Sequence, residues 1–219
     1  MRTSSLCSLV LALLLGACAS APPTVVEQPD ALLADRLFAP PAERVSTDRV
    51  FELSDAMRRY LTVDIALQLR TKGNQRGLIE ALYRQAQLKL EYDASMTKTA
   101  AEAFETRSGN CLALVIMTAA FAKELKLSVQ YQSAILEETW SRAGNLLFAS
   151  GHVNLTVGGR PFEGGLNHDF RSTTIDFLPP EEIRGLRTRE IDEATVLAMF
   201  ANNRAAEALV RGQLDDAYA

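Results

Sequence analysis

The sequence predicts an α+β fold in which helices precede a set of antiparallel strands. Three observations support this prediction. Apolar residues recur at helical spacing between residues 50 and 83, and the run from Cys111 to Leu125 is apolar on nearly every side. Beyond Leu127 the apolar period changes to two, which is typical of strands. About 170 residues follow the N-terminal segments, enough for one domain with a sizeable core.

The N-terminus carries a targeting segment. Arg2 supplies a positive charge, and the apolar run from Leu6 to Leu15 is too short to span a bilayer. Small residues then stand directly before Cys18, a pattern that resembles the lipobox of bacterial lipoproteins. The resemblance implies cleavage before Cys18 and a lipid on that cysteine; the alternative is an ordinary secretory signal. Because Ala19 is not acidic, the resemblance also implies an outer-membrane lipoprotein that faces the periplasm.

Composition indicates the order of the segments. Prolines at positions 22–23 and 40–41 favour an extended tether. We therefore expect a signal peptide at residues 1–17, the lipidated cysteine and tether at 18–46, a folded domain at 47–190 and a helical tail at 191–219. The formal net charge is −4, and acidic and basic residues are interspersed without a basic stripe, so no nucleic-acid partner is expected.

The helical half is predicted from apolar stripes and capping residues. Gly109 and Asn110 come just before the apolar run and place Cys111 in the first turn of a buried helix. Residues 88–93 alternate like a short strand or an extended connector. The other predicted helices begin at Ser46 and run to Leu61, follow Gly73-Asn74, and span Thr97–Thr106.

Three strands are predicted at residues 127–136, 152–157 and 172–178. In the second, His152, Asn154 and Thr156 share one face, and Gly158-Gly159 ends it with a turn. Trp140 is expected in a loop between strands, where it either covers an edge of the core or walls a substrate groove.

From Ile191 onward the chain is predicted to be helical again, with Gly212 dividing one long helix from the next. Asn202-Asn203, Ala205-Ala206, Gly212 and Ala217 together resemble half of a tetratricopeptide repeat. A single repeat cannot bury its own face. The tail therefore either docks on the domain or belongs to a longer array, and it is a candidate surface for a protein partner.

Cysteine usage directs attention to one thiol. Cys7 would leave with the signal and Cys18 would be lipidated, which leaves Cys111 as a lone free thiol in a compartment where disulfides form readily. Cys111 is either a small core residue or a nucleophile. A nucleophilic thiol needs a helix N-terminus or a histidine beside it to favour the thiolate, and a carboxylate to orient that histidine.

The sequence offers His152 as the base and Asp176 as the orienting carboxylate, both on polar faces of predicted strands. His168 and its neighbour Asp169 are the rivals, in a Gly- and Asn-rich stretch. A zinc site is the other alternative, but no C-x-x-C or H-x-x-x-H pair brings ligands together. We therefore expect neither a metal nor a cofactor.

These motifs resemble the transglutaminase-like superfamily, a branch of the papain-like cysteine enzymes. The matching residues are Gly109-Asn110-Cys111, Lys126-Leu127-Ser-Val129, Gly151-His152-Val153-Asn154 and Ile175-Asp176-Phe177, within residues 75–180. The resemblance implies a papain/transglutaminase-like fold with the Cys-bearing helix on a small antiparallel sheet. It also implies Cys111 as nucleophile, His152 as acid and base and Asp176 as orienting residue. Val153 and Phe177 depart from the family pattern, which has an aromatic residue and a proline there.

Two functions follow as expectations. The first is a thiol enzyme that acts on amide bonds of a protein or peptide substrate, by hydrolysis rather than cross-linking, with the backbone N–H of Cys111 as oxyanion donor. The second is a catalytically silent scaffold of the same fold that binds protein partners through residues 191–219.

Overall fold

The computed structural model describes residues 33–42, 44–83, 88, 90–158, 172–178 and 187–219. The predicted signal peptide, Cys18 and most of the predicted tether lie outside these residues, as do His168 and Asp169. Within the described part of the chain, no helix is long and apolar enough to cross a membrane. Residues 1–38 and 39–219 form two separate units, and the described residues of the first contain one short 3-10 helix, η3 (Asp35–Leu37).

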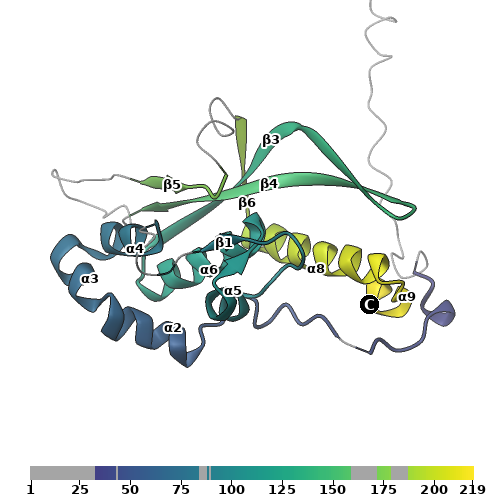
Figure 1. The fold of residues 1–219 in the computed structure, drawn as a ribbon, viewed down its shortest axis with the longest axis horizontal. Coiled ribbons are helices and arrows are strands. Elements are labelled where there is room, and N and C mark those ends of the chain that lie inside the picture. The colour runs from purple at the N-terminus through teal and green to yellow at the C-terminus, as the bar shows by residue number, and fades with distance from the viewer. Residues whose placement is uncertain (1–32, 43, 84–87, 89, 159–171, 179–186) are drawn as a thin grey trace, which may run out of the picture. The chain divides into compact units, whose positions relative to one another are not determined.

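The second unit combines helices with small sheets, in agreement with an α+β fold. Helices lie on one side of a four-stranded sheet (Figure 1). The elements in chain order are α2 (Asp55–Arg59), the π-helical turn η4 (Tyr60–Asp64), α3 (Ala66–Lys72), α4 (Asn74–Tyr83), β1 (Glu91–Tyr92), α5 (Ala100–Thr106), β2 (Ser108–Gly109), α6 (Cys111–Glu124), β3 (Ser128–Ala143), β4 (Leu146–Gly158), β5 (Thr173–Ile175), β6 (Arg187–Ile191), α8 (Glu193–Val210) and α9 (Leu214–Tyr218).

The first helix begins later than predicted. Residues 48–51 form a turn, and α2 begins at Asp55 because the Ser54 side chain accepts a hydrogen bond from the Met57 N–H and caps the helix. The predicted helix after Gly73-Asn74 is confirmed as α4. Gly73 has φ +80°, a conformation that glycine adopts readily, and it separates α3 from α4.

Helix α6 is the centre of the core, as its all-round apolar sequence predicted. Every residue from Leu112 to Ala122 is buried. Phe121 packs against Tyr60 and Phe104 with ring centroids 5.8 and 5.6 Å apart, and these rings tie η4 and α5 to α6. The burial of the whole helix fixes its first residue, Cys111, relative to the surrounding elements.

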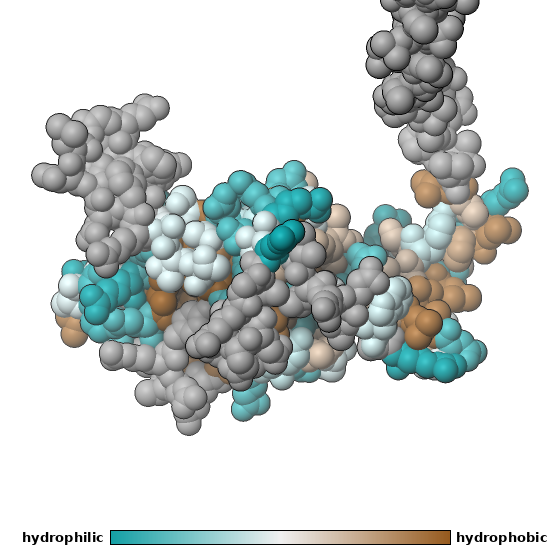
Figure 2. Space-filling model, turned by 90° about the horizontal axis from the view of Figure 1, so that it is seen from above, coloured by the Kyte–Doolittle hydropathy of each residue, from teal (hydrophilic) through white to brown (hydrophobic). Residues whose placement is uncertain are grey.

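The sheet is antiparallel, with strand order β5-β4-β3-β6. Strands β3 and β4 form a long hairpin that turns at Gly144, whose φ is +59°. Trp140 was predicted in a loop; it lies in β3 opposite Ala149 and is 57% exposed, because the hairpin extends beyond the core. Figure 2 looks onto the sheet from the side opposite the helices and shows hydrophilic and neutral residues over much of this face.

Strand β6 was not predicted. It lies at the edge of the sheet, pairs with β3 from Tyr131 to Ile135, and exposes four of its five residues, so its sequence carries no apolar alternation. Helix α8 starts at Glu193 because the Asp192 side chain caps it through the Thr195 N–H.

The helical tail packs on the domain. Val196, Phe200 and Ala208 of α8 are buried, and residues 191–219 belong to the same compact unit as the sheet. Gly212, with φ +73°, separates α8 from α9 as predicted. The carboxylates of Asp215 and Asp216 accept hydrogen bonds from the N–H groups of Ala39 and Ala42, so the end of the predicted tether is bound to α9.

Candidate active site

Cys111 is the first residue of α6, and its free thiol is partly exposed. Asn110 caps the helix: its Oδ1 accepts from the Ala113 N–H at 2.9 Å, while its Nδ2 donates to Thr97 Oγ1 at 2.8 Å. The cap therefore also ties the start of the helix to the chain before α5. The sequence prediction of Cys111 in the first turn is confirmed.

A buried lysine holds the segment before the cysteine. Lys98 is 6% exposed, and its Nζ donates to Asp93 Oδ2 at 2.9 Å and to Ser108 Oγ at 2.7 Å. The hydrogen bonds from Ser95 and from Lys98 hold the pKa of Asp93 below its usual range. Ser108 belongs to β2, which pairs with β1 through Tyr92 and Gly109. These contacts position the two residues that precede Asn110.

Gly109 is required by a close approach to the helix. A Cβ built on Gly109 would lie 2.8 Å from the Cβ of Ala113, which has no flexible side chain to move away. We expect Gly109→Ala to lower the free energy of unfolding by about 1–3 kcal/mol, measured by urea titration. Gly151→Ala is the control, because a Cβ there meets no atom within 4 Å. Equal stability of the two variants would contradict this packing argument.

His152 and Asp176 meet through strand register. Leu155 pairs with Ile175 in the antiparallel β4–β5 ladder, so Asp176, one residue past β5, lies near the His152–Asn154 stretch. His152 Nε2 lies 2.8 and 2.9 Å from the two carboxylate oxygens of Asp176, and Asn154 Nδ2 donates to Oδ2 at 2.9 Å. Alternation predicted that His152 and Asn154 lie on a polar strand face. Both side chains are buried, at 2% and 4% exposed, and their polar groups bond Asp176.

The carboxylate and the thiol both act on the imidazole. Burial by itself lowers the pKa of His152, but the hydrogen bonds and charges of Asp176 and Cys111 raise it to about 9. Burial raises the pKa of Asp176, yet hydrogen bonds from His152, the Leu178 N–H and Asn154 bring it below its usual value. Because Asp176 occupies Nε2, Nδ1 is the ring nitrogen left for Cys111. The imidazole is thus bonded to a carboxylate and lines the same hollow as the thiol.

The raised pKa of His152 predicts a pH-dependent stability. Folding favours the protonated imidazole, so this stabilisation is full below pH 6.5 and is lost as the pH rises to about 9. It amounts to at most about 3.5 kcal/mol, at about 1.4 kcal/mol per tenfold change in an ionisation equilibrium. We expect urea midpoints to fall over this interval and to fall less in Asp176→Asn. A fall of the same size in both proteins would show that another group is responsible.

The start of α6 also presents backbone donors. The Ala113 N–H is capped by Asn110 Oδ1, and the Leu114 N–H bonds the Asn110 carbonyl. In the first turn this leaves the N–H groups of Cys111 and Leu112, which have no intrahelical acceptor. Such donors can stabilise an oxyanion that develops next to the sulfur.

Sequence reasoning missed Tyr92. This residue lies on β1 opposite Gly109, and burial and the Cys111 charge both raise the pKa of its hydroxyl. Residues 88–93 were predicted only as a short strand or an extended connector, and no sequence motif includes Tyr92. The pairing of β1 with β2 is the feature that brings it to the cysteine.

A cleft with two hollows opens at the cysteine. The hollow beside His152 has a volume of about 340 Å³, and the other, beside Tyr92, has about 530 Å³. Both are lined by residues of the β3–β4 hairpin and of α8. The residues that they share are Cys111, Ala149, Gly151, Asn202 and Asn203.

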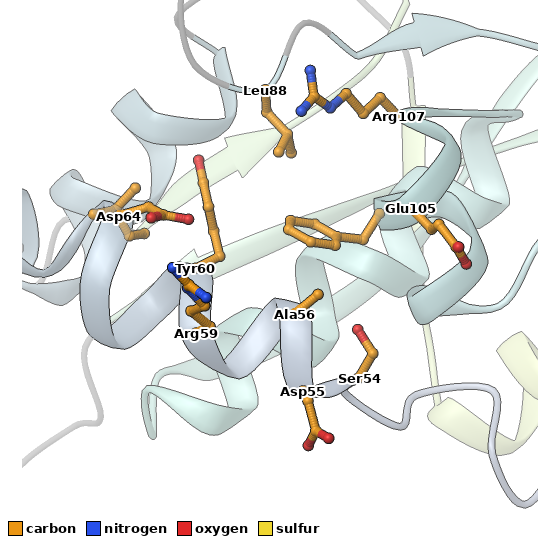
Figure 3. A pocket seen from close by; sticks show the side chains of 11 residues that line it. Ser54, Asp55, Ala56, Arg59, Tyr60, Asp64, Leu88, Glu105 and Arg107 are labelled. Atoms are coloured by element: carbon orange, nitrogen blue, oxygen red, sulfur yellow. The ribbon is translucent and has the colours of Figure 1, made fainter.

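A larger cavity, of about 830 Å³, shares no lining residue with this cleft. Figure 3 shows the Tyr60 ring and the Leu88 side chain directed into it. The buried Tyr60 hydroxyl has no hydrogen-bond partner among the described residues, and burial, together with the charge of Asp64, raises its pKa to about 12. The described residues that line this cavity include no cysteine or histidine, so they supply no pair of nucleophile and base.

Asp176 bonds Nε2 of His152, and His152 and Cys111 line the same hollow. In the described part of the chain no three His, Cys, Asp or Glu side chains gather as metal ligands do. Comparison of the chain with family models, curated proteins and solved structures found no match.

Proposed function

We propose that this chain is a thiol enzyme that hydrolyses amide bonds of peptides or proteins through Cys111, His152 and Asp176. One observation carries the proposal: the imidazole of His152, bonded to the Asp176 carboxylate, lines the same hollow as the Cys111 thiol at the start of a buried helix. Nucleophilic thiols are activated by this combination of base, orienting carboxylate and helix N-terminus.

The proposed reaction has two halves. The thiol proton passes to His152, the sulfur attacks the amide carbonyl carbon, and the oxyanion is bound by the N–H groups of Cys111 and Leu112. The C–N bond then breaks as His152 gives the proton to the departing amine, which leaves a thioester on Cys111. Water, deprotonated by His152, attacks the thioester, and the products are a carboxylic acid and the regenerated thiol. Asp176 orients the ring and stabilises its charged form throughout.

The resemblance of residues 75–180 to the transglutaminase-like superfamily supports the same chemistry, and we propose a fold of that papain-like type. The lipobox-like residues before Cys18 support a lipid anchor. We propose that the enzyme is an outer-membrane lipoprotein that faces the periplasm.

Alkylation by iodoacetamide across pH tests the proposal. The label on Cys111 is measured by mass spectrometry of the peptide that contains it, which separates it from the other two cysteines. We expect the rate at pH 6 to stay within about tenfold of the rate at pH 9 and to fall at least about tenfold in His152→Ala, because the imidazolium stabilises the thiolate. Thr156→Ala, on the same strand, is the control. The proposal would be overturned if the alkylation rate had the pH dependence of an ordinary free thiol and did not change in His152→Ala.

The second candidate is the non-catalytic scaffold. Leu209 and Leu214, at the α8–α9 junction, are 38% and 60% exposed, and such apolar side chains are available to a protein partner. Because α8 contributes buried residues, deleting the tail would unfold the domain. The double variant Leu209→Ser/Leu214→Ser is the better test. The scaffold predicts that it removes the cellular function while Cys111→Ser retains it; the enzyme predicts the reverse.

A further inference from the structure

Helix α8, predicted from sequence as a repeat-like tail, forms one wall of the cleft that contains Cys111. Figure 1 shows it running below the outer half of the β3–β4 hairpin. Asn202 and Asn203 of α8 and Ala149 and Gly151 of β4 line both hollows of the cleft. A substrate that reaches the cysteine therefore lies between the hairpin and the helix.

The hairpin wall is open at Gly151. A Cβ there would meet no atom within 4 Å, so the space over this residue is empty. Gly151 also lies at the register shift, where the ladder passes from the Ala134–His152 pair to the Thr139–Ser150 pair. It has no partner residue in the β3–β4 register, and because it has no side chain, an extended chain in the cleft can approach its main chain closely.

The opposite wall carries two carboxamides. Asn202 and Asn203 each offer a donor and an acceptor, the same complement as a peptide bond, and neither brings a charge. Among the described residues that line the hollow beside Tyr92, Glu207 accepts from the Thr97 N–H at 2.6 Å and pairs with Arg204, and Arg211 donates to the neutral side chain of Gln213. The two carboxamides, which line both hollows, are therefore suited to the hydrogen-bonding groups of a neutral main chain.

Among the described residues, those that line the hollow beside His152 include no Lys, Arg, Asp or Glu. Its lining residues are Cys111, Leu112, Ser133, Ala149, Gly151, His152, Val153, Thr195, Ala198, Met199, Asn202 and Asn203. The charge of His152 is already paired with Asp176, so a charged side chain placed there would lose hydration without gaining a free counter-charge, which is unfavourable. The alanines and the glycine leave room for an uncharged side chain.

Resting on the proposed function, we infer that the substrate is a polypeptide in extended conformation, held between the hairpin and α8. Its main chain bonds Gly151, Asn202 and Asn203, and one side chain next to the scissile amide, uncharged, fills the hollow beside His152. The repeat-like residues of α8 are thus specificity-determining residues of the enzyme.

A library of peptides from a digested proteome, incubated with the full chain under reducing conditions, tests this inference. Mass spectrometry of the products gives the residues on both sides of each cleaved bond. We expect one position beside the bond to exclude Lys, Arg, Asp and Glu. Cleavage that tolerates charged residues equally at every position would overturn the inference.

Two exposed alanines one turn apart on α8 provide matched variants. Ala198 lines the hollow beside His152, whereas Ala194 lines neither hollow. On a peptide that the wild type cleaves, we expect Ala198→Trp to lower kcat/KM at least about tenfold, and Ala194→Trp to leave it within about twofold. The double variant Asn202→Ala/Asn203→Ala should raise KM about tenfold with little change in kcat. It removes hydrogen bonds to the substrate main chain but none to the atoms that react.

Alkylation of Cys111 by iodoacetamide is measured in parallel, because this small reagent does not need the cleft walls. Unchanged alkylation with the expected losses of kcat/KM supports the inference. If alkylation depends on His152 but Ala198→Trp behaves as Ala194→Trp, or if no peptide in the library is cleaved, the inference fails and the thiol chemistry stands. If alkylation is also indifferent to His152→Ala, both proposals fail.

Discussion

Replacing Cys111 by serine is expected to reduce hydrolysis of a susceptible peptide by at least about a thousandfold. The hydroxyl fits the space of the thiol, so the fold and the cap by Asn110 are retained, but a serine hydroxyl ionises far less readily than a thiol and is the poorer nucleophile here. The measurement is kcat/KM from chromatographic detection of the amine product.

The double variant Cys111→Ser/His152→Ala is the control for shared action. The effects of replacing residues that act in one step are not additive. The kcat/KM of the double variant should therefore lie within about threefold of the kcat/KM of Cys111→Ser alone. If the two losses, expressed as free energies, simply add, His152 and Cys111 act independently, contrary to the proposed shared step in the hollow that both residues line.

Phe121→Ala is expected to lower the free energy of unfolding by about 3–5 kcal/mol. Phe121 is fully buried on α6, and its ring packs on Tyr60 and Phe104 from two other elements. The deletion leaves a cavity that these rigid neighbours cannot fill. Urea unfolding followed by circular dichroism measures the change.

Leu147→Ala is the matched control for this prediction. Leu147 is 65% exposed on the hairpin, and its truncation should change the stability by less than about 0.5 kcal/mol. A similar loss in both variants would show that the core is not organised around α6.

Helix α6 and its cysteine could be predicted because the evidence is local. Eleven consecutive buried residues give an apolar run with no polar face, and Asn110 supplies a cap next to it. The strand with His152 was predictable from alternation for the same reason. Asp176 could be named as a candidate, but its contact with His152 depends on the β4–β5 register, which no local sequence pattern predicts.

Other features had no local signal. Strand β6 exposes most of its side chains, so pairing with β3 alone defines it. Ser46 looked like a cap as much as Ser54 does, and only the bond from the Met57 N–H distinguishes the true start of α2. Tyr92 reaches the cysteine through a two-residue parallel pairing with β2.

By itself, the sequence determined the buried helix, the types of most other elements and the residues able to act as nucleophile, base and carboxylate. These follow from periodicity, capping and side-chain chemistry. The tertiary structure decided which of these residues meet and what surrounds them. It brought Asp176 to Nε2 of His152, and it made α8 a wall of the cleft over Cys111. The physical reason is that strand register and helix docking depend on contacts between residues far apart in the chain, and these contacts are optimised together.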